Sequence, residues 1–526
     1  MKRTNGILAH PTSFPSPYGI GDLGQGATNF VDFLYEAKQK LWQVLPLGPT
    51  SFCDSPYQSF STFAGNILLI SPDILKKEGY LTEEELEYFS GDDAHRIDYG
   101  QIIITKTKMY KKAFARFKEG CMHKDDEFLK FCQKNAEWLN NYTLFVALKD
   151  YFIQERNGTF KTPEYLEFYN TAKKVLTEDQ INDYFYGAVW ITWPDSIKNS
   201  KAQAIQKWSQ KLSNEIQYYK FLQYQFFKQW GSLKEYANEK DIQIIGDIPI
   251  FVAFDSADVW SNKELYYLDQ KGYPTCVAGV PPDYFSETGQ LWGNPLYDFE
   301  KHKKTGYDWW IKRIKNMLDM VDILRIDHFR GFDSYWSVPF GEATAIKGKW
   351  CKGPGREIFD EIKKALGDLP IIAEDLGIIT NEVEELRDSL GFPGMKVLQF
   401  GFEAWGKGDH MPHNFQTSNL VVYTGTHDND TSVGWYNSLP ESVKDYFRCY
   451  CNVSGDDVSW DMIRLAMSSV ANTCIIPMQD LLRLDSKHRI NLPGVPSGNW
   501  QFRIVDTSSY SNIANQLKYL GHMFNR

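Results

Sequence analysis

The stretch DILRIDHFRGF, residues 322–332, begins as an apolar strand and then becomes rich in charge. Side chains alternate between the two faces of a strand, so Arg325 and Asp327 share one face while Leu324 and Ile326 take the other. Opposite charges are costly to bury unless they pair or bind something. The stretch therefore predicts a buried strand whose carboxyl end opens on a polar site.

Seven other short apolar runs resemble this one, and the segments between most of them have helical periodicity. The eight runs span residues 6–9, 42–47, 242–247, 322–327, 370–375, 394–400, 420–426 and 474–479. This alternation is typical of a parallel α/β sheet, and eight strands favour a (β/α)8 barrel. An open doubly wound sheet is the alternative, but GIGDLGQG at residues 19–26 indicates a loop entering a helix at about 27–40 rather than a dinucleotide-binding turn.

Two insertions interrupt the predicted barrel. Residues 49–240 include long amphipathic patterns at 125–155 and 213–240, which predict a mostly helical insertion between the second and third strands. Residues 250–305 are rich in Gly, Pro and aromatic residues, so we expect loops over the active-site end of the barrel. We expect residues 1–526 to form a single catalytic barrel domain with these two insertions.

Composition narrows the class of partner. The formal net charge is −10 and no long Lys/Arg block occurs, which disfavours nucleic acid or an acidic membrane surface and favours a neutral ligand. Neither a signal peptide nor an apolar run of 18 residues is apparent, and the eight cysteines are scattered. We therefore expect a soluble cytoplasmic protein with reduced thiols. Aromatic residues make up 15% of the chain, enough for some to stack on sugar rings.

Carboxylates and one histidine follow four of the predicted strands. They are Asp247, Asp327, Glu374, Asp375, His427 and Asp428. In a barrel these strand ends converge on one pocket. Two carboxyl groups suit glycosyl transfer, whereas metal-assisted hydrolysis would use the same acids with His328 and His427 as ligands. The chain has no H-x-H or H-E-x-x-H pattern, and Arg325 would repel a dication, so we favour sugar chemistry without a metal or other cofactor.

Each of these residues also has a purely structural interpretation. Arg325 and Asp327 could be a buried ion pair, Asp428 a helix cap and His427 a core histidine. Acids at four separate strand ends make coincidence a weak explanation for the whole set.

Six motifs together resemble the 4-α-glucanotransferases called amylomaltases or disproportionating enzymes, glycoside hydrolase family 77 of the α-amylase clan. The motifs are GDIPIFVAFDSADVW, GVPPDYFSETGQLWGNPLY, LRIDHFRGF, IIAEDLG, VVYTGTHDND and PSGNWQFR, and the resemblance begins near SPYGIGDLG. Two departures from ordinary α-amylases agree with this family: DIPIFV lacks their Asn-His pair, and about 47 residues follow the last predicted strand, too few for a C-terminal β-sandwich.

The resemblance implies a role for each matching residue. Asp327 would be the nucleophile, Glu374 the general acid/base and Asp428 a third carboxylate that holds sugar hydroxyls. Arg325 would keep the nucleophile ionised, and His427 would contact the donor sugar. The remaining substrate-binding positions would be Tyr57, Asp247, Trp260 and Asn294, and residues 279–295 would form a flexible loop over the glucan.

The implied activity is transfer of a 1,4-α-glucan segment, with retention, to the 4-hydroxyl of another glucan or of glucose. Maltooligosaccharides, amylose, and glycogen or starch glucans would be the substrates. A glucan hydrolase of the same clan and a glucan-binding protein without catalysis are the competing hypotheses. The sequence leaves the oligomeric state and the roles of His328 and Arg330 open.

Overall fold

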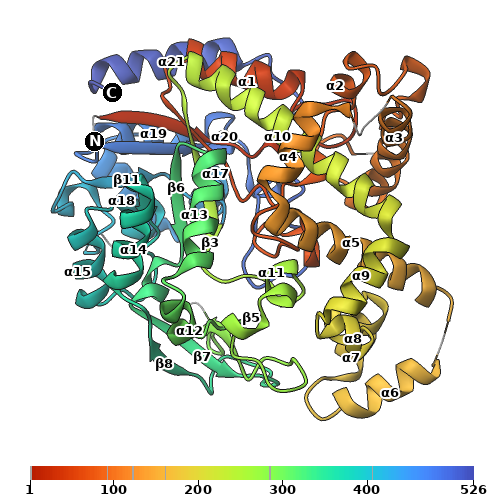
Figure 1. Cartoon of the computed structure of the whole chain (residues 1–526). Helices are drawn as coiled ribbons and strands as arrows, with labels where there is room; N and C mark the ends of the chain where they lie inside the picture. Colours follow the sequence, from red (N-terminus) through yellow and green to blue (C-terminus); the bar gives the residue numbers. More distant parts are fainter. Residues whose placement is uncertain are drawn as a thin grey trace.

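A computed structural model describes residues 3–89, 91, 93–120, 124–159, 161–282, 286–404 and 407–526 (Figure 1). Its largest sheet has eight parallel strands in the order β10-β11-β12-β1-β2-β3-β6-β9. In chain order these are β1 (Thr4–Leu8), β2 (Leu41–Gln43), β3 (Gln243–Pro249), β6 (Ile323–Asp327), β9 (Ile371–Ala373), β10 (Gly394–Val397), β11 (Leu420–Tyr423) and β12 (Thr473–Pro477). Each predicted apolar run overlaps one of these strands.

The two outer strands of this order meet and bring the sheet round on itself. The backbone N–H of Ala373, in β9, donates to the carbonyl of Pro393, immediately before β10, at 3.0 Å. The predicted (β/α)8 barrel is therefore confirmed, and the open doubly wound alternative is wrong. The boundaries differ most at β2, which ends at Gln43 although the apolar run continues to residue 47.

The barrel interior holds an apolar cluster that is distinct from the core outside the strands. Its strand members include Leu8, Leu41, Ile245, Ile323, Ile372, Met395, Val421 and Ile475. Ile245 and Ile323 lie two residues before Asp247 and Arg325, so these pairs share the inward face of their strands. Apolar side chains therefore fill the body of the barrel, and charged side chains begin at its carboxyl end.

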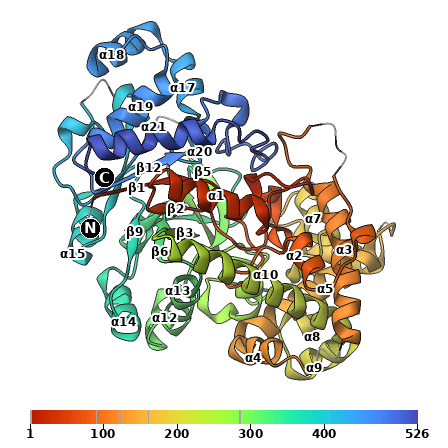
Figure 2. The ribbon, with the colours of Figure 1, turned by 90° about the horizontal axis from the view of Figure 1, so that it is seen from above.

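Helices surround the strands, as Figure 2 shows for α10, α13, α14 and α21. The helices outside the large insertion are α1 (Gln25–Glu36), α11 (Ala257–Ser261), α12 (Phe299–Lys304), α13 (Asp308–Met320), α14 (Arg356–Leu366), α15 (Asn381–Leu390), α16 (Leu398–Glu403), α17 (Ser432–Ser438), α18 (Glu441–Cys451), α19 (Val458–Ser468), α20 (Met478–Leu481) and α21 (Tyr510–Met523). After β12 the described residues form no further strand.

The segment between β2 and β3 is mostly helical. It contains α2 (Pro72–Lys77), α3 (Tyr99–Glu119), α4 (Asp126–Lys134), α5 (Ala136–Arg156), α6 (Pro163–Ala172), α7 (Glu178–Tyr186), α8 (Asp195–Lys198), α9 (Ala202–Lys211) and α10 (Ser213–Glu239). The pattern at 125–155 forms two helices, because Asn135 has a non-helical backbone conformation and separates α4 from α5. Helix α10 binds the loop after β2: Gln223 exchanges hydrogen bonds with the backbone of Gly65, at 2.8 and 2.9 Å.

The segment 250–305 contains more regular structure than the loops we expected. Strands β4 (Cys276–Val280) and β5 (Gln290–Pro295) join β7 (Ser334–Pro339) and β8 (Lys349–Lys352) in an antiparallel sheet of order β5-β4-β7-β8. These strands are short, and much of β5 is exposed, so they carry no clear apolar alternation. Residues 283–285 of the expected flexible loop lie outside the described residues.

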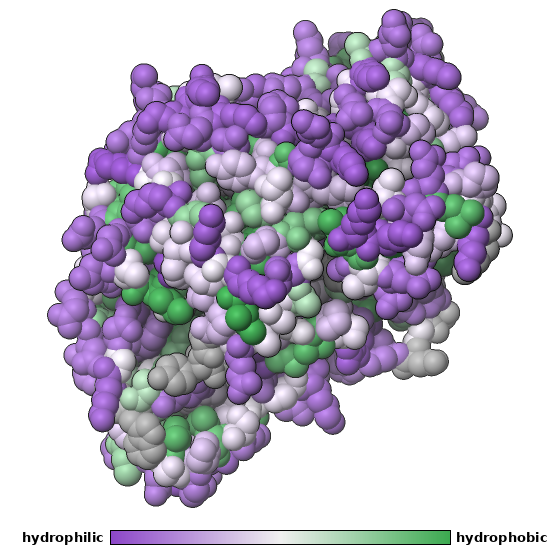
Figure 3. All heavy atoms as spheres, turned by 90° about the horizontal axis from the view of Figure 1, so that it is seen from below, coloured by the Kyte–Doolittle hydropathy of each residue, from purple (hydrophilic) through white to green (hydrophobic). Residues whose placement is uncertain are grey.

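Figure 3 shows one face on which hydrophilic side chains predominate and hydrophobic ones appear in small patches. Among the described residues, every helix is too short or too polar to cross a membrane.

Candidate functional site

Asp247, Arg325 and Asp327 form a chain of ion pairs at the carboxyl end of the barrel. The β3–β6 register places Asp247 opposite Arg325. The Arg325 guanidinium donates through Nη1 to Asp247 Oδ2 and through Nη2 to Asp327 Oδ1, the latter at 3.0 Å. Asp247 and Arg325 are buried, whereas the Asp327 side chain is 29% exposed. Of these three residues, Asp327 is therefore the one that an outside molecule can reach.

Glu374 lies beside Asp327 because Ile326 pairs with Ala373 across β6 and β9. Its two carboxyl oxygens accept from the backbone N–H groups of His328, at 2.6 Å, and Leu376, at 2.7 Å. The side chain is held against the strand ends by two donors from different segments.

The environments of the two neighbouring acids differ. Burial raises the pKa of Glu374, and the negative charge of Asp327 raises it further, against the opposing effects of Arg325 and the backbone donors. Burial also raises the pKa of Asp327, but the directly paired Arg325 is the strongest influence in the other direction. The arrangement therefore favours a proton on Glu374 and a negative charge on Asp327.

Asp428 and His427 follow β11 on another side of the site. His427 Nε2 lies 3.3 Å from Asp428 Oδ1, and Asn491 Nδ2 donates to the same oxygen at 2.6 Å. The His427 ring stacks on Tyr57, with centroids 5.1 Å apart and planes 12° from parallel. Since the Tyr57 hydroxyl donates to Asp247 Oδ2 at 2.8 Å, Tyr57 links the two groups of acids.

Tyr57, Asp327, His427, Asp428 and Asn491 border a cleft of about 260 Å³. Its lining includes the polar residues Asn294, Asp327, His328, His427, Asp428 and Asn491 and the aromatic residues Tyr57, Phe251, Trp292 and Trp500. A cleft with carboxyl groups at its floor and several flat rings in its walls suits a polyhydroxylated ring compound. Asn294, which we predicted from the sequence, lies in this wall and accepts from Gln58 Nε2 at 3.3 Å.

The structure also places the two residues whose roles the sequence left open. His328 lines the cleft in a left-handed conformation (φ 55°), with its ring edge-to-face with Trp292 at 4.8 Å. Burial lowers its pKa to about 3, so the ring is neutral at physiological pH. Arg330 instead packs over Trp350, at 3.9 Å from the ring centroid, and donates to the carbonyl of Ile378.

Two predicted substrate-binding residues, Trp260 and Asp247, lie elsewhere than expected. Trp260 is 1% exposed, and its indole donates to the carbonyl of Ile197 at 3.1 Å among core aromatics, so the prediction that it lines the groove is wrong. Asp247 and Arg325 are buried beneath the cleft because they neutralise one another inside the barrel. The prediction that Asp247 lines the groove is therefore wrong too. Asp247 contacts Arg325 and Tyr57, and of these three residues only Tyr57 lines the cleft.

Trp292, Asn491 and Trp500 line the cleft but were not predicted individually. All three come from chain outside the barrel strands, so strand-end reasoning could not find them. Trp292 and Trp500 lie in the quoted motifs GQLWGNP and PSGNWQFR, which is the signal that could have indicated them. Asn491 has no comparable local signal.

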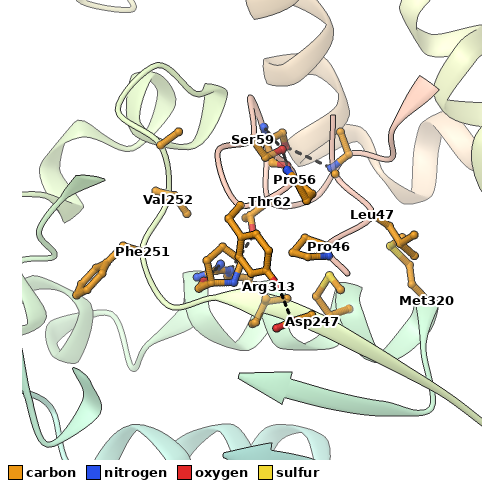
Figure 4. A pocket seen from close by; sticks show the side chains of 18 residues that line it. Pro46, Leu47, Pro56, Ser59, Thr62, Asp247, Phe251, Val252, Arg313 and Met320 are labelled. Carbon is orange, nitrogen blue, oxygen red and sulfur yellow. Dashed lines mark hydrogen bonds between the residues drawn. The ribbon is translucent and has the colours of Figure 1, made fainter. Parts of the chain in front are cut away.

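Buried Arg313, from α13, fixes the loops that carry the cleft wall. Its Nε donates to Thr62 Oγ1 at 2.7 Å and its Nη1 to the carbonyl of Ile250 at 2.9 Å. Figure 4 shows Thr62, from the segment after β2, and Val252, from the segment after β3, around the small pocket that contains this arginine. One side chain thus joins two cleft-forming loops that are distant in sequence.

Comparison with known proteins identifies the family. The family 77 model of glycoside hydrolases, described as 4-alpha-glucanotransferase, matches residues 9–507. The chain is 47% identical to a 4-alpha-glucanotransferase of Synechocystis sp. (100% of this chain, 98% of that protein) and 44% identical to one of Clostridium butyricum (98% and 99%). A Streptococcus agalactiae amylomaltase structure, in complex with acarbose, superposes with a TM-score of 0.91 at 40% identity over 100% of both chains. With this match extending over nearly its whole length, the chain belongs to the 4-alpha-glucanotransferase family, glycoside hydrolase family 77.

Proposed function

We propose that this protein is a retaining 4-α-glucanotransferase whose nucleophile is Asp327 and whose general acid/base is Glu374. The observation that carries the proposal is the juxtaposition of these two acids at the ends of β6 and β9, with Arg325 paired to only one of them. Retaining glycosyl transfer requires one ionised and one protonated carboxyl group. The environments of Asp327 and Glu374 differ in that direction.

In the first half of the reaction, protonated Glu374 donates to the leaving glycosidic oxygen while ionised Asp327 attacks the anomeric carbon. The C–O bond to the leaving glucan breaks as the bond to Asp327 forms. Esterified Asp327 no longer carries the charge that raises the pKa of Glu374. Glu374, now a carboxylate, is therefore suited to deprotonate the acceptor.

In the second half, the 4-hydroxyl of an acceptor glucan or glucose loses its proton to Glu374 and displaces Asp327, which restores both groups. Asp428 would hold sugar hydroxyls, since its carboxylate is exposed and already oriented by Asn491. Rings of Tyr57, Trp292 and Trp500 would stack on glucose units and help to exclude water.

We expect maltooligosaccharides, amylose, and glycogen or starch glucans as donors. The described cysteines form no disulfides, which agrees with action in a reducing compartment such as the cytoplasm. The reaction needs no cofactor.

Incubation with maltotriose alone separates transfer from the alternative, hydrolysis by an amylase-clan enzyme. A transferase should release glucose and form a ladder of longer maltooligosaccharides. Products limited to glucose and maltose would contradict the proposal.

Asp327→Asn tests the nucleophile. This change keeps the side-chain shape but removes the attacking charge, so turnover should fall by at least about a thousandfold while maltotriose still binds. Asp375→Asn serves as a neighbouring control, because Asp375 is paired with Arg387 and accepts from the Met395 N–H, apart from the cleft lining. Undiminished turnover in Asp327→Asn would refute the assignment.

A further inference from the structure

A second cavity, of about 310 Å³, lies between α5, α11 and α13. We propose that it is an additional binding site for a glucose unit of a neutral α-glucan, separate from the cleft that contains Asp327. The ligand class rests on the proposed function; the existence of the site rests on the features of the cavity itself. It shares no lining residue with the cleft.

Aromatic rings form one side of this cavity. Trp138 is half-buried, and its ring lies nearly parallel to Phe63, with centroids 6.4 Å apart and planes 13° from parallel. Trp309 meets Phe63 edge-to-face at 6.2 Å. Flat rings of this kind pack against the C–H faces of a pyranose, so the cavity has the apolar component of a sugar site.

Side-chain amides supply the polar component. Asn141 makes no side-chain hydrogen bond to any other described residue. Asn316 donates to the carbonyl of Phe63 at 3.2 Å, and Asn262 donates to the carbonyl of Asp258 at 2.9 Å, but their amide oxygens accept nothing from the described chain. Asn141 therefore has unused donors and acceptors, and Asn316 and Asn262 have unused acceptor oxygens, at a partly solvent-exposed cavity, as recognition of hydroxyl groups requires.

Charge at the cavity favours a neutral ligand. Lys312 pairs with Glu137 at 2.5 Å, and Lys315 pairs with Asp319 at 2.8 Å. Lys134 lies 3.7 Å from Asp319 as well. Since each lysine in the lining has a carboxylate partner, a phosphorylated ligand would have to displace existing ion pairs, whereas a neutral polyol would not.

The cavity is connected to the cleft through the loop after β2. Asp258, in its lining, accepts from the backbone N–H of Thr62 at 2.8 Å, and Arg313 holds the Thr62 hydroxyl from the other side. The same loop carries Tyr57, which lines the cleft. A glucan bound in the cavity would thus rest against a segment that continues into the cleft wall.

Calorimetric titration with maltotriose tests the proposal, using Asp327→Asn protein so that the ligand is not consumed. We expect a class of binding sites that weakens at least tenfold when Trp138→Ala is added, while the class at the cleft is unchanged. Asn141→Leu, on the same helix face, should weaken the same class by about threefold or more through loss of hydrogen bonds. Trp208→Ala is the matched control: Trp208 is a half-buried tryptophan of the same helical insertion, outside the cavity lining.

Circular dichroism melting identifies any variant that fails to fold, and Asn141→Leu then replaces Trp138→Ala as the deciding variant. Maltotriose binding unaffected by the folded cavity variants would overturn the inference. If the unsubstituted enzyme forms the product ladder but the folded cavity variants lose no class of maltotriose-binding sites, the proposed second site is wrong and the proposed function stands. Loss of a class in the cavity variants, with no ladder from the unsubstituted enzyme, would instead contradict the proposed function and support the site.

Discussion

Replacing Arg325 with Met removes the cation that Asp247 and Asp327 share, and we expect the acid limb of the pH–rate profile to move to higher pH. In the intact protein Arg325 opposes the rise in the pKa of Asp327 that burial causes. Without it, the nucleophile requires a higher pH to ionise, so kcat/KM at low pH should fall more than at high pH.

The separation of the charges bounds the size of this effect. At the observed 3.0 Å, and with an effective dielectric constant of about 20, the Arg325–Asp327 attraction is at most about 5.5 kcal/mol. An arginine beside an aspartate commonly lowers its pKa by about 1 to 3 units. We therefore expect the acid limb to move up by about 1 to 3 pH units. Buried Asp247 also loses its cation, which should cost about 3–5 kcal/mol in the free energy of unfolding.

The assay is glucose release from maltotriose between about pH 4 and pH 9, with urea unfolding measured on the same preparations. Arg325→Lys keeps the charge and should show a smaller displacement of the acid limb. Lys149→Met is the control for stability, because it breaks another pair, between buried Lys149 and partly buried Asp255, far along the chain from Asp327. An acid limb that stays in place in Arg325→Met, or that moves to lower pH, would refute the reasoning.

Three further predictions follow from other side chains. Trp260→Phe should lower the free energy of unfolding by about 1–3 kcal/mol, through loss of the hydrogen bond to Ile197, yet leave the KM for maltotriose within about twofold; a large rise in KM would mean that Trp260 does reach the substrate. Burial raises the pKa of Asp258 to about 6, so its ionisation destabilises the fold as pH rises from about 4 to 6. The free energy of unfolding of Asp258→Asn, measured in urea, should therefore rise relative to that of the parent protein by up to about 3 kcal/mol between pH 4 and pH 7. An equal difference between variant and parent at both pH values would contradict this. Exhaustive chelation should leave the transfer rate unchanged, because the described residues contain no cluster of His, Cys, Asp and Glu suited to a metal ion, and a loss that added metal restores would refute that expectation.

The barrel and its floor could be predicted from local sequence because few interactions decide them. Alternation in residues 322–327 places Arg325 and Asp327 on one face, and parallel pairing alone then brings Asp247 and Glu374 beside them. Strand ends were informative since all eight point to the same end of the barrel.

The walls of the cleft were harder to predict, because their positions depend on contacts between distant segments. Trp260 lies in a motif of the family, but whether its ring faces a sugar or the core depends on α5 and on Trp193, which it meets edge-on. Likewise, β4 pairs with β7 only after the chain has passed through β5, α12, α13 and β6. No local pattern of the sequence determines either the orientation of Trp260 or the pairing of β4 with β7.

The pairing of β1 with β12 has a consequence for how the chain folds. Thr4 lies beside Thr473 in this ladder, so the first strand acquires one of its two neighbours only when almost the whole polypeptide is available. During synthesis the barrel must stay open along this seam, with β1 paired only to β2, and contacts of such long range are formed slowly. We expect a nascent chain that lacks β12 to be trapped readily by chaperones or proteases, and its release from them to coincide with closure of the β1–β12 seam.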